Sequence, residues 1–140
     1  MLRASANVVR ALSPLRFEVV DPARADRIAA RGPGYAVSIE PSGAKVTLLV
    51  PSAHDAAVPV TLSISLSGAS AVAPTTSKLL PGVSNYFVGS APSGWRTGVR
   101  GFARVTQPSV LPGVDVVYYG ARDGELEYDL VLAAGVKPSE

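Results

Sequence analysis

The sequence predicts an all-β domain, an antiparallel β-sandwich with little helix, and three observations carry this prediction. Several short segments alternate apolar and polar residues, as strands with one buried and one solvated face do. The 13 glycines and 12 prolines are spread along the chain, as turns between short strands require. No segment has the apolar spacing of an amphipathic helix of useful length.

Eight segments show this alternation or a short apolar pattern with strand-forming residues, and each is predicted to be a strand. In chain order they cover residues 17–20, 34–40, 45–50, 60–67, 85–89, 102–107, 114–120 and 125–132. The segments between them, including 68–82 and 90–101, are predicted to be mostly turns and connections. Residues 22–32 are expected to include one helical turn that ends at Gly32.

Two patterns also predict which side chains share a face. The turn PSGA (41–44) lies between two alternating segments, so residues 34–50 are expected to form a β-hairpin. Residues 60–67 alternate most strictly, and one set of alternate residues is expected to face the core. That set is Val60, Leu62, Ile64 and Leu66.

Length and composition favour one folded domain, with residues 1–16 as a poorly structured lead-in and residues 17–140 as the β-rich part. Apolar residues make up 47% of the chain and charged residues 17%, which argues against disorder. The absence of cysteine excludes disulfides and thiolate metal sites. No run of Lys and Arg suggests a nucleic-acid partner, and no apolar run has the length of a membrane span.

The last two predicted strands place acidic residues at alternate positions, and their register decides what these residues face. A tight Asp123–Gly124 turn would mix polar and apolar side chains on both faces. A five-residue loop, 120–124, gives one wholly apolar face and pairs Tyr118 with Leu126, so this register is predicted. It sets Asp115 directly opposite Asp129.

The face of the last two predicted strands that carries the acidic residues is either solvated or occupied by a cation. Calcium takes several oxygen ligands at once, and four carboxylates are candidates: Asp115, Glu125, Glu127 and Asp129. The solvated acidic face is the favoured interpretation, because no Asp-rich calcium loop is present and no other cofactor is indicated. Glu125 and Glu127 also lie at the spacing of a hydrolase carboxylate pair, which is the least favoured interpretation.

Aromatic residues supply the other candidate site. Trp95 and Arg96, joined by Tyr119 and other tyrosines, are the candidate residues for stacking against sugar rings, although core packing is the favoured interpretation of Trp95. A Ser-His-Asp site has little support, because the only histidine, His54, lies in a predicted loop and no G-x-S-x-G segment is present.

Three stretches carry a family resemblance: LPGVSNYFVGSAPSGWRTGVRGFARV (80–105), LPGVDVVYYG (111–120) and LEYDLVLAAGVKPS (126–139). Together with RGPGYAVSIEPSGA (31–44) and LRFE (15–18), they resemble the N-terminal domain of bacterial proteins with SBBP β-propeller repeats. The segment VVDPARADR (19–27) departs from that pattern. The resemblance implies a secreted or cell-surface protein with propeller-type domains downstream, and it implies no catalytic activity.

The expected function is therefore a non-catalytic structural or adhesion-type module, with carbohydrate binding as the alternative. The family pattern continues past Ser139, so the domain is expected to be truncated at its C-terminal end. A missing neighbour would leave an unpaired strand edge, and self-association through residues 125–132 is predicted. Glycans or protein surfaces are the other expected partners.

Overall fold

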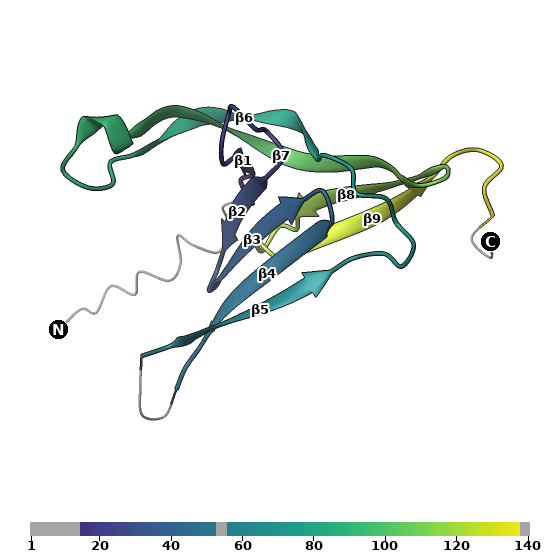
Figure 1. The fold of residues 1–140 in the computed structure, drawn as a ribbon, viewed down its shortest axis with the longest axis horizontal. Coiled ribbons are helices and arrows are strands. Elements are labelled where there is room, and N and C mark those ends of the chain that lie inside the picture. The colour runs from purple at the N-terminus through teal and green to yellow at the C-terminus, as the bar shows by residue number, and fades with distance from the viewer. Residues whose placement is uncertain (1–14, 53–55, 138–140) are drawn as a thin grey trace.

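The strands of the protein form two antiparallel sheets, which confirms the all-β prediction (Figure 1). The structure is a computed structural model, and it describes residues 15–52 and 56–137. One sheet has the order β1-β2-β3-β4-β5 and the other β6-β7-β8-β9. The strands are β1 Glu18–Val19, β2 Ile28–Gly32, β3 Tyr35–Glu40, β4 Gly43–Val50, β5 Val58–Ile64, β6 Thr75–Tyr86, β7 Arg96–Leu111, β8 Val114–Gly120 and β9 Leu126–Leu132.

The β3–β4 hairpin forms as its alternation predicts. Val37 lies opposite Val46 and Ile39 opposite Ala44, so the apolar residues of both strands share one face. The turn closes at Gly43, whose φ of 129° is open to glycine and strained for other residues. This hairpin forms the middle of the first sheet.

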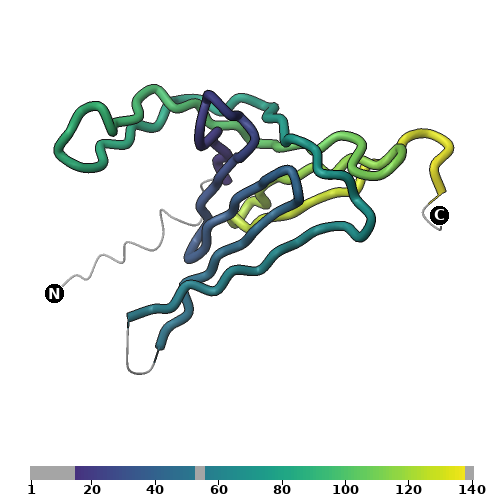
Figure 2. Tube along the Cα trace, in the orientation of Figure 1, coloured from purple at the N-terminus to yellow at the C-terminus, as the bar shows by residue number. Residues whose placement is uncertain are grey.

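The second sheet is built on a long hairpin, β6–β7, whose strands extend beyond the rest of the domain (Figure 1). A 3₁₀ turn, Pro92–Gly94, lies between the two strands at the far end. The trace in Figure 2 shows the chain crossing from the end of β5 to the start of β6 at one end of the sandwich. The sheets are therefore connected once, by residues 65–74.

The core lies between the middle strands of the two sheets. Its largest fully buried side chains include Phe17, Ile28, Ile39 and Val105. Leu15, which precedes β1, is also buried and lies against Gly120, where a β-carbon would collide with it. Leu15 thus belongs to the core although it falls in the stretch expected to be a poorly structured lead-in, and the rest of that expectation, for residues 1–14, lies outside the described residues.

Three predicted connections are wrong because they contain strands. In residues 22–32 the turn does not end at Gly32: it is closed by the N–H of Ala25, which donates to the carbonyl oxygen of Asp21 at 2.8 Å, and Ile28–Gly32 is β2, paired with β1 on one side and β3 on the other. Much of 68–82 belongs to β6, and 90–101 contains the start of β7. The β6–β7 register shifts between Leu79 and Val83 and again after Ser84, and these irregularities break the alternation that marks a strand in sequence.

For the last hairpin, the predicted division into an apolar and an acidic face is confirmed, but the predicted cross-strand partners are wrong. Tyr118 lies opposite Tyr128, not Leu126, and the loop covers residues 121–125. This two-residue slip keeps the apolar face together, since side chains alternate with a period of two. It places Asp115 opposite Val131, so the predicted pairing of Asp115 with Asp129 is wrong.

Candidate functional site

The two long sides of the sandwich differ in how they are closed. On one side Phe17 and Phe102 exchange two backbone hydrogen bonds, with N···O distances of 3.0 and 2.8 Å, and so join the sheets. On the other side, among residues 15–52 and 56–137, β5 and β9 are each paired to one neighbour only. Apart from Leu126, which packs against the core, the inner-face residues of these two strands are exposed, and we call them the open side: Val58, Val60, Leu62, Ile64, Tyr128, Leu130 and Leu132.

The open side corrects the prediction that β5 contributes to the core. Leu62 lies opposite Val46, which packs against the core, so its side chain points to the predicted face. It is nevertheless 52% exposed, because β5 is the last strand of its sheet and extends past the buried region. Val60 and Ile64 are exposed for the same reason, and of the four residues only Leu66 packs against the core.

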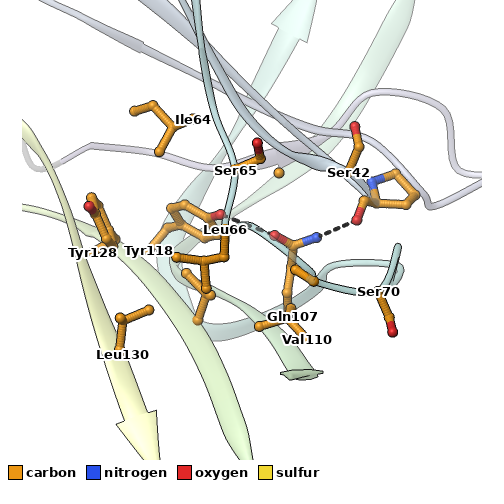
Figure 3. Close-up of a pocket in the computed structure, with 14 residues that line it drawn as sticks. Ser42, Ile64, Ser65, Leu66, Ser70, Gln107, Val110, Tyr118, Tyr128 and Leu130 are labelled. Atoms are coloured by element: carbon orange, nitrogen blue, oxygen red, sulfur yellow. Dashed lines mark hydrogen bonds between the residues drawn. The ribbon is translucent and has the colours of Figure 1, made fainter. Parts of the chain in front are cut away.

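A small cavity lies at one end of the open side (Figure 3). Ile64 lines it from the first sheet, and Tyr128 and Leu130 line it from β9. The Tyr118 and Tyr128 rings lie 6.3 Å apart between centroids, and the cavity has a volume of about 30 Å³. Because one cavity is lined from both edge strands, β5 and β9 face each other at this end.

Gln107 forms the polar wall of this cavity and was missed at the sequence level. Its side-chain amide donates to the carbonyl oxygens of Glu40, Pro41 and Val72 at 2.8–3.2 Å. Its Oε1 accepts a hydrogen bond from the hydroxyl of Tyr118 at 3.1 Å (Figure 3). Only 2% of Gln107 is exposed. The available signal was its position two residues after Val105, on the core-facing side of an alternating strand.

A second polar cluster, also missed, holds β1 against the β6–β7 hairpin. The carboxylate of Glu18 accepts hydrogen bonds from Arg16 Nε at 3.0 Å, from Ser84 Oγ at 2.6 Å and from the hydroxyl of Tyr86. Burial raises the pKa of Glu18, but the three hydrogen bonds together outweigh it and leave the pKa below its usual value. The hydrogen bond to Glu18 raises the pKa of Tyr86. The cluster lines an open cavity of about 450 Å³.

The three predicted ligand-binding residues do not form one site. Trp95 lies at the end of the β6–β7 hairpin, and Arg96 donates to the carbonyl oxygen of Val19 at 2.8 Å. Tyr119 lies opposite Arg104. Arg104 is eight residues after Arg96 along β7, which corresponds to roughly 25 Å of strand. Tyr119 is therefore far from Trp95 and Arg96.

The core-packing interpretation of Trp95 is wrong. The side chain is 41% exposed, and its indole N–H donates to the carbonyl oxygen of Gly89 at 3.2 Å. The ring of Phe87 lies edge-on at 5.2 Å and is itself exposed. Both rings lie at the end of the projecting hairpin, where no second layer from the described part of the chain covers them, so they form a small exposed aromatic pair.

The four predicted calcium ligands all lie on the β8–β9 hairpin but are spread along it, since Asp115 is opposite Val131, six residues and roughly 20 Å of strand from Glu125. Asp115 accepts the backbone N–H of Ser109 at 2.7 Å, and Asp129 accepts the hydroxyl of Tyr119 at 3.0 Å. Glu127 is on the same outer face of β9, and Glu125 is in the loop before it. Among residues 15–52 and 56–137, no three Asp, Glu or His side chains are placed to hold a metal ion. The calcium site stays a prediction.

The carboxylate pair considered for hydrolysis, Glu125 and Glu127, lies away from four cavities among the described residues. Neither Glu125 nor Glu127 lines the small cavity of Figure 3, the cavity at Glu18, or the two others nearby. One of these two, of about 360 Å³, lies beside Asp21 and Glu40, and the other, of about 610 Å³, beside Trp95. His54 lies outside the described residues.

Comparison with known proteins identifies a family and no function. In the described part of the chain, no helix has both the length and the apolar character needed to cross a membrane. Searches of curated proteins and of solved structures gave no match. Residues 22–140 match the family described as "Domain of unknown function (DUF7948)". Because this match covers most of the chain, the protein belongs to the DUF7948 family.

Proposed function

We propose that this domain is a non-catalytic β module, structural or adhesion-type, that binds other macromolecules through its open side. The observation that carries the proposal is the exposure of apolar inner-face residues on both edge strands, with Leu62 and Leu130 52% and 44% exposed. Contiguous apolar surface of this kind marks interaction sites in soluble domains. The residues continue the two faces that form the core, so a bound partner would extend that core.

The roles of the buried polar groups support a non-catalytic module. Gln107 and Glu18 are the best-shielded members of the two polar clusters, and each uses its side-chain oxygens or nitrogens to hold strands together. The amide of Gln107 does not titrate, and the lowered pKa of Glu18 makes its carboxylate a weak general base. A screen of hydrolytic activities should be blank, and turnover abolished by Glu127→Gln would contradict the proposal.

The setting that we propose is a secreted or cell-surface bacterial protein with propeller-type domains after this one. The resemblance of residues 80–105, 111–120 and 126–139 to domains of SBBP-repeat proteins supports it. The sequence of the complete gene tests it. A signal peptide before this region and propeller repeats after it are expected, and a leaderless gene without repeats would contradict the setting.

A dye-binding experiment tests the open side as a binding surface. The folded chain should bind anilinonaphthalene sulfonate, which reports exposed apolar surface, and Leu62→Lys/Leu130→Lys should abolish the signal without loss of cooperative unfolding. The matched control, Thr61→Lys/Ser63→Lys, adds the same charge to the outer face of β5 and should leave dye binding unchanged. Equal dye binding by both double variants would overturn the proposal.

Carbohydrate binding is the second candidate, and the exposed aromatic pair favours it. Trp95 and Phe87 project at the end of the β6–β7 hairpin, and aromatic faces of this kind stack on sugar rings. Because Trp95 is the single tryptophan, its fluorescence reports on this site directly. Titration with oligosaccharides should give a saturable shift if this candidate is right. A flat titration across a broad oligosaccharide panel would exclude it.

A further inference from the structure

We propose that the partner of the open side is an extended segment of another polypeptide, which adds to β9 as a new strand. The segment carries apolar side chains at alternate positions and Lys or Arg at the positions between them. This inference rests on the proposed function, and it specifies the chemistry of the partner. Strand addition of this kind uses backbone hydrogen bonds for affinity and alternate side chains for specificity.

The backbone of β9 is the better of the two edges for such pairing. β9 is paired with β8 on one side, and its seven residues, Leu126–Leu132, include no proline. β5 contains Pro59, which lacks an N–H and is tolerated in sheets at edges where the missing donor faces solvent. The free edge of β5 is therefore interrupted, whereas the free edge of β9 offers a full set of donors and acceptors.

The inner face explains why the partner needs apolar residues at every second position. A strand beside β9 would place alternate side chains next to Tyr128, Leu130 and Leu132, with Leu62 and Ile64 on the opposing sheet. The cavity of about 30 Å³ between Ile64 and Leu130 lies at the end of this surface. Apolar side chains would bury surface against both sheets, which is the main driving force for such an association.

The outer face explains why the partner needs cations between its apolar residues. Glu127 and Asp129 both lie on the outer face of β9, and neither forms an ion pair within residues 15–52 and 56–137. Asp129 accepts a hydrogen bond from the hydroxyl of Tyr119. Lys or Arg on the added strand would lie directly opposite these carboxylates, and opposite charges across a strand pair are favourable.

The same charges disfavour a second copy of this chain as the occupant. An antiparallel β9–β9 pair centred on Asp129 would set this carboxylate opposite its own copy. A pair centred on Tyr128 would set Glu127 opposite Asp129 twice. Like charges directly opposite each other are destabilising, so the partner with cations is favoured over self-pairing in both central registers.

Synthetic peptides of ~9 residues, long enough to span β9, test the inference on the full 140-residue chain. The probe alternates lysine and valine, one control alternates glutamate and valine, and a second control has the composition of the probe in an order that breaks the alternation. Fluorescence anisotropy should show saturable binding of the probe. Affinity should fall about tenfold for the glutamate peptide, since two opposed pairs change sign, and should be undetectable for the scrambled one.

Two further experiments test whether the outer face of β9 sets the charge preference and whether the peptide pairs through its backbone. Glu127→Lys/Asp129→Lys should reverse the preference between the lysine and glutamate peptides, while Thr61→Lys/Ser63→Lys should not. N-methylation of all valine amides or of all lysine amides blocks opposite edges of the peptide, because successive N–H groups point to opposite sides. One methylated peptide should bind like the probe, and the other should not bind.

The outcomes separate this inference from the proposed function. Dye binding at the open side combined with equal affinity for alternating and scrambled peptides would overturn strand addition and leave the binding surface in place. Equal effects of the two methylation patterns, or concentration-dependent dimers that exclude the peptide, would also overturn it. If the unaltered folded chain bound neither the dye nor the peptides, the proposed function itself would be overturned.

Discussion

The buried side-chain amide of Gln107 joins several separate segments of the chain. It contacts the carbonyl oxygens of Glu40, Pro41 and Val72, and it accepts from Tyr118. It therefore links β7 to the β3–β4 turn, to the connection that precedes β6, and to β8. The carbonyl oxygen of Pro41 also accepts the N–H of Val72 at 3.0 Å, so removal of the amide should be felt most at the other acceptors.

Replacing this amide should be costly. Gln107→Leu keeps a similar volume and leaves buried carbonyl groups and the hydroxyl of Tyr118 unsatisfied, so the free energy of unfolding should fall by about 3 kcal/mol. Tyr118→Phe removes only one of the hydrogen bonds and should cost about 1–2 kcal/mol. Urea unfolding measures both values. Equal costs for the two variants would show that the amide does not hold the backbone segments together.

The carboxylate of Glu18 should make stability depend on pH. Its pKa is lowered in the folded state, because hydrogen bonds from Ser84, Tyr86 and Arg16 outweigh the effect of burial. A lowered pKa stabilises the fold at pH values above about 4.3, the usual value for glutamate, and this stabilisation is lost as the pH falls through the folded-state pKa.

Glu18→Gln should therefore lower the free energy of unfolding by about 1–3 kcal/mol at pH 7 and by progressively less below pH 5. Tyr86→Phe, which removes one of the donors, should give an intermediate dependence. Urea unfolding at several pH values between about 3 and 7 checks both variants. Parallel stability curves for the native chain and Glu18→Gln would show that this carboxylate is not the source of the acid sensitivity.

At the scale of elements, the β8–β9 hairpin determines how the acidic residues are displayed. Its loop places Gly124 at a φ of 82°, and the N–H of Gly124 donates to the carbonyl oxygen of Ala121 at 3.0 Å. The carbonyl oxygen of Gly124 accepts a hydrogen bond from the hydroxyl of Tyr35. The loop is thus fixed both internally and against the first sheet.

Gly124→Ala should destabilise the domain by about 1 kcal/mol, because a side chain is strained at this φ. Gly94→Ala is the matched control, since Gly94 has an ordinary φ. The nearest neighbour of the new β-carbon would be the carbonyl oxygen of Val88, at an ordinary contact distance of 3.5 Å. That control should change the free energy of unfolding by less than about 0.5 kcal/mol. Thermal or urea unfolding compares the two. A costless Gly124→Ala would indicate a different loop and hence a different register.

The elements that the sequence predicts well are those in which alternation is unbroken. The β3–β4 hairpin and the apolar face of β8–β9 follow directly from period-two patterns. β6 could not be found in this way, because Lys78 has a φ of 60° and the register shifts on both sides of Val83. The apolar pattern could not distinguish the predicted from the observed register of β8–β9, because two registers that differ by two residues place the same side chains on the inner face.

The candidate site was less predictable than the strands. The alternation of Leu62 and Ile64 gives their common face, but it does not show that the opposing sheet ends before it covers them. Burial at a sheet edge depends on how far the two sheets overlap, and that overlap is set by contacts distant in sequence. The Glu18 cluster depends on such contacts too, because its hydrogen-bond donor Ser84 is 66 residues away along the chain.

At the scale of the whole molecule, the sandwich is closed on one long side and open on the other. Phe17 and Phe102 join the sheets by backbone hydrogen bonds on the closed side. On the open side the apolar faces of β5 and β9 continue beyond the core. Both the proposed function and the inferred partner strand depend on this asymmetry.

A comparison of Ile39→Ala with Leu62→Ala tests this asymmetry most directly. Both residues lie on the inner face of the first sheet, but Ile39 is fully buried and Leu62 is 52% exposed. Urea unfolding of the two variants should show a loss of about 2–5 kcal/mol for Ile39→Ala and less than about 1 kcal/mol for Leu62→Ala. A loss for Leu62→Ala as large as that for Ile39→Ala would mean that β5 is covered in solution, and it would contradict the open side.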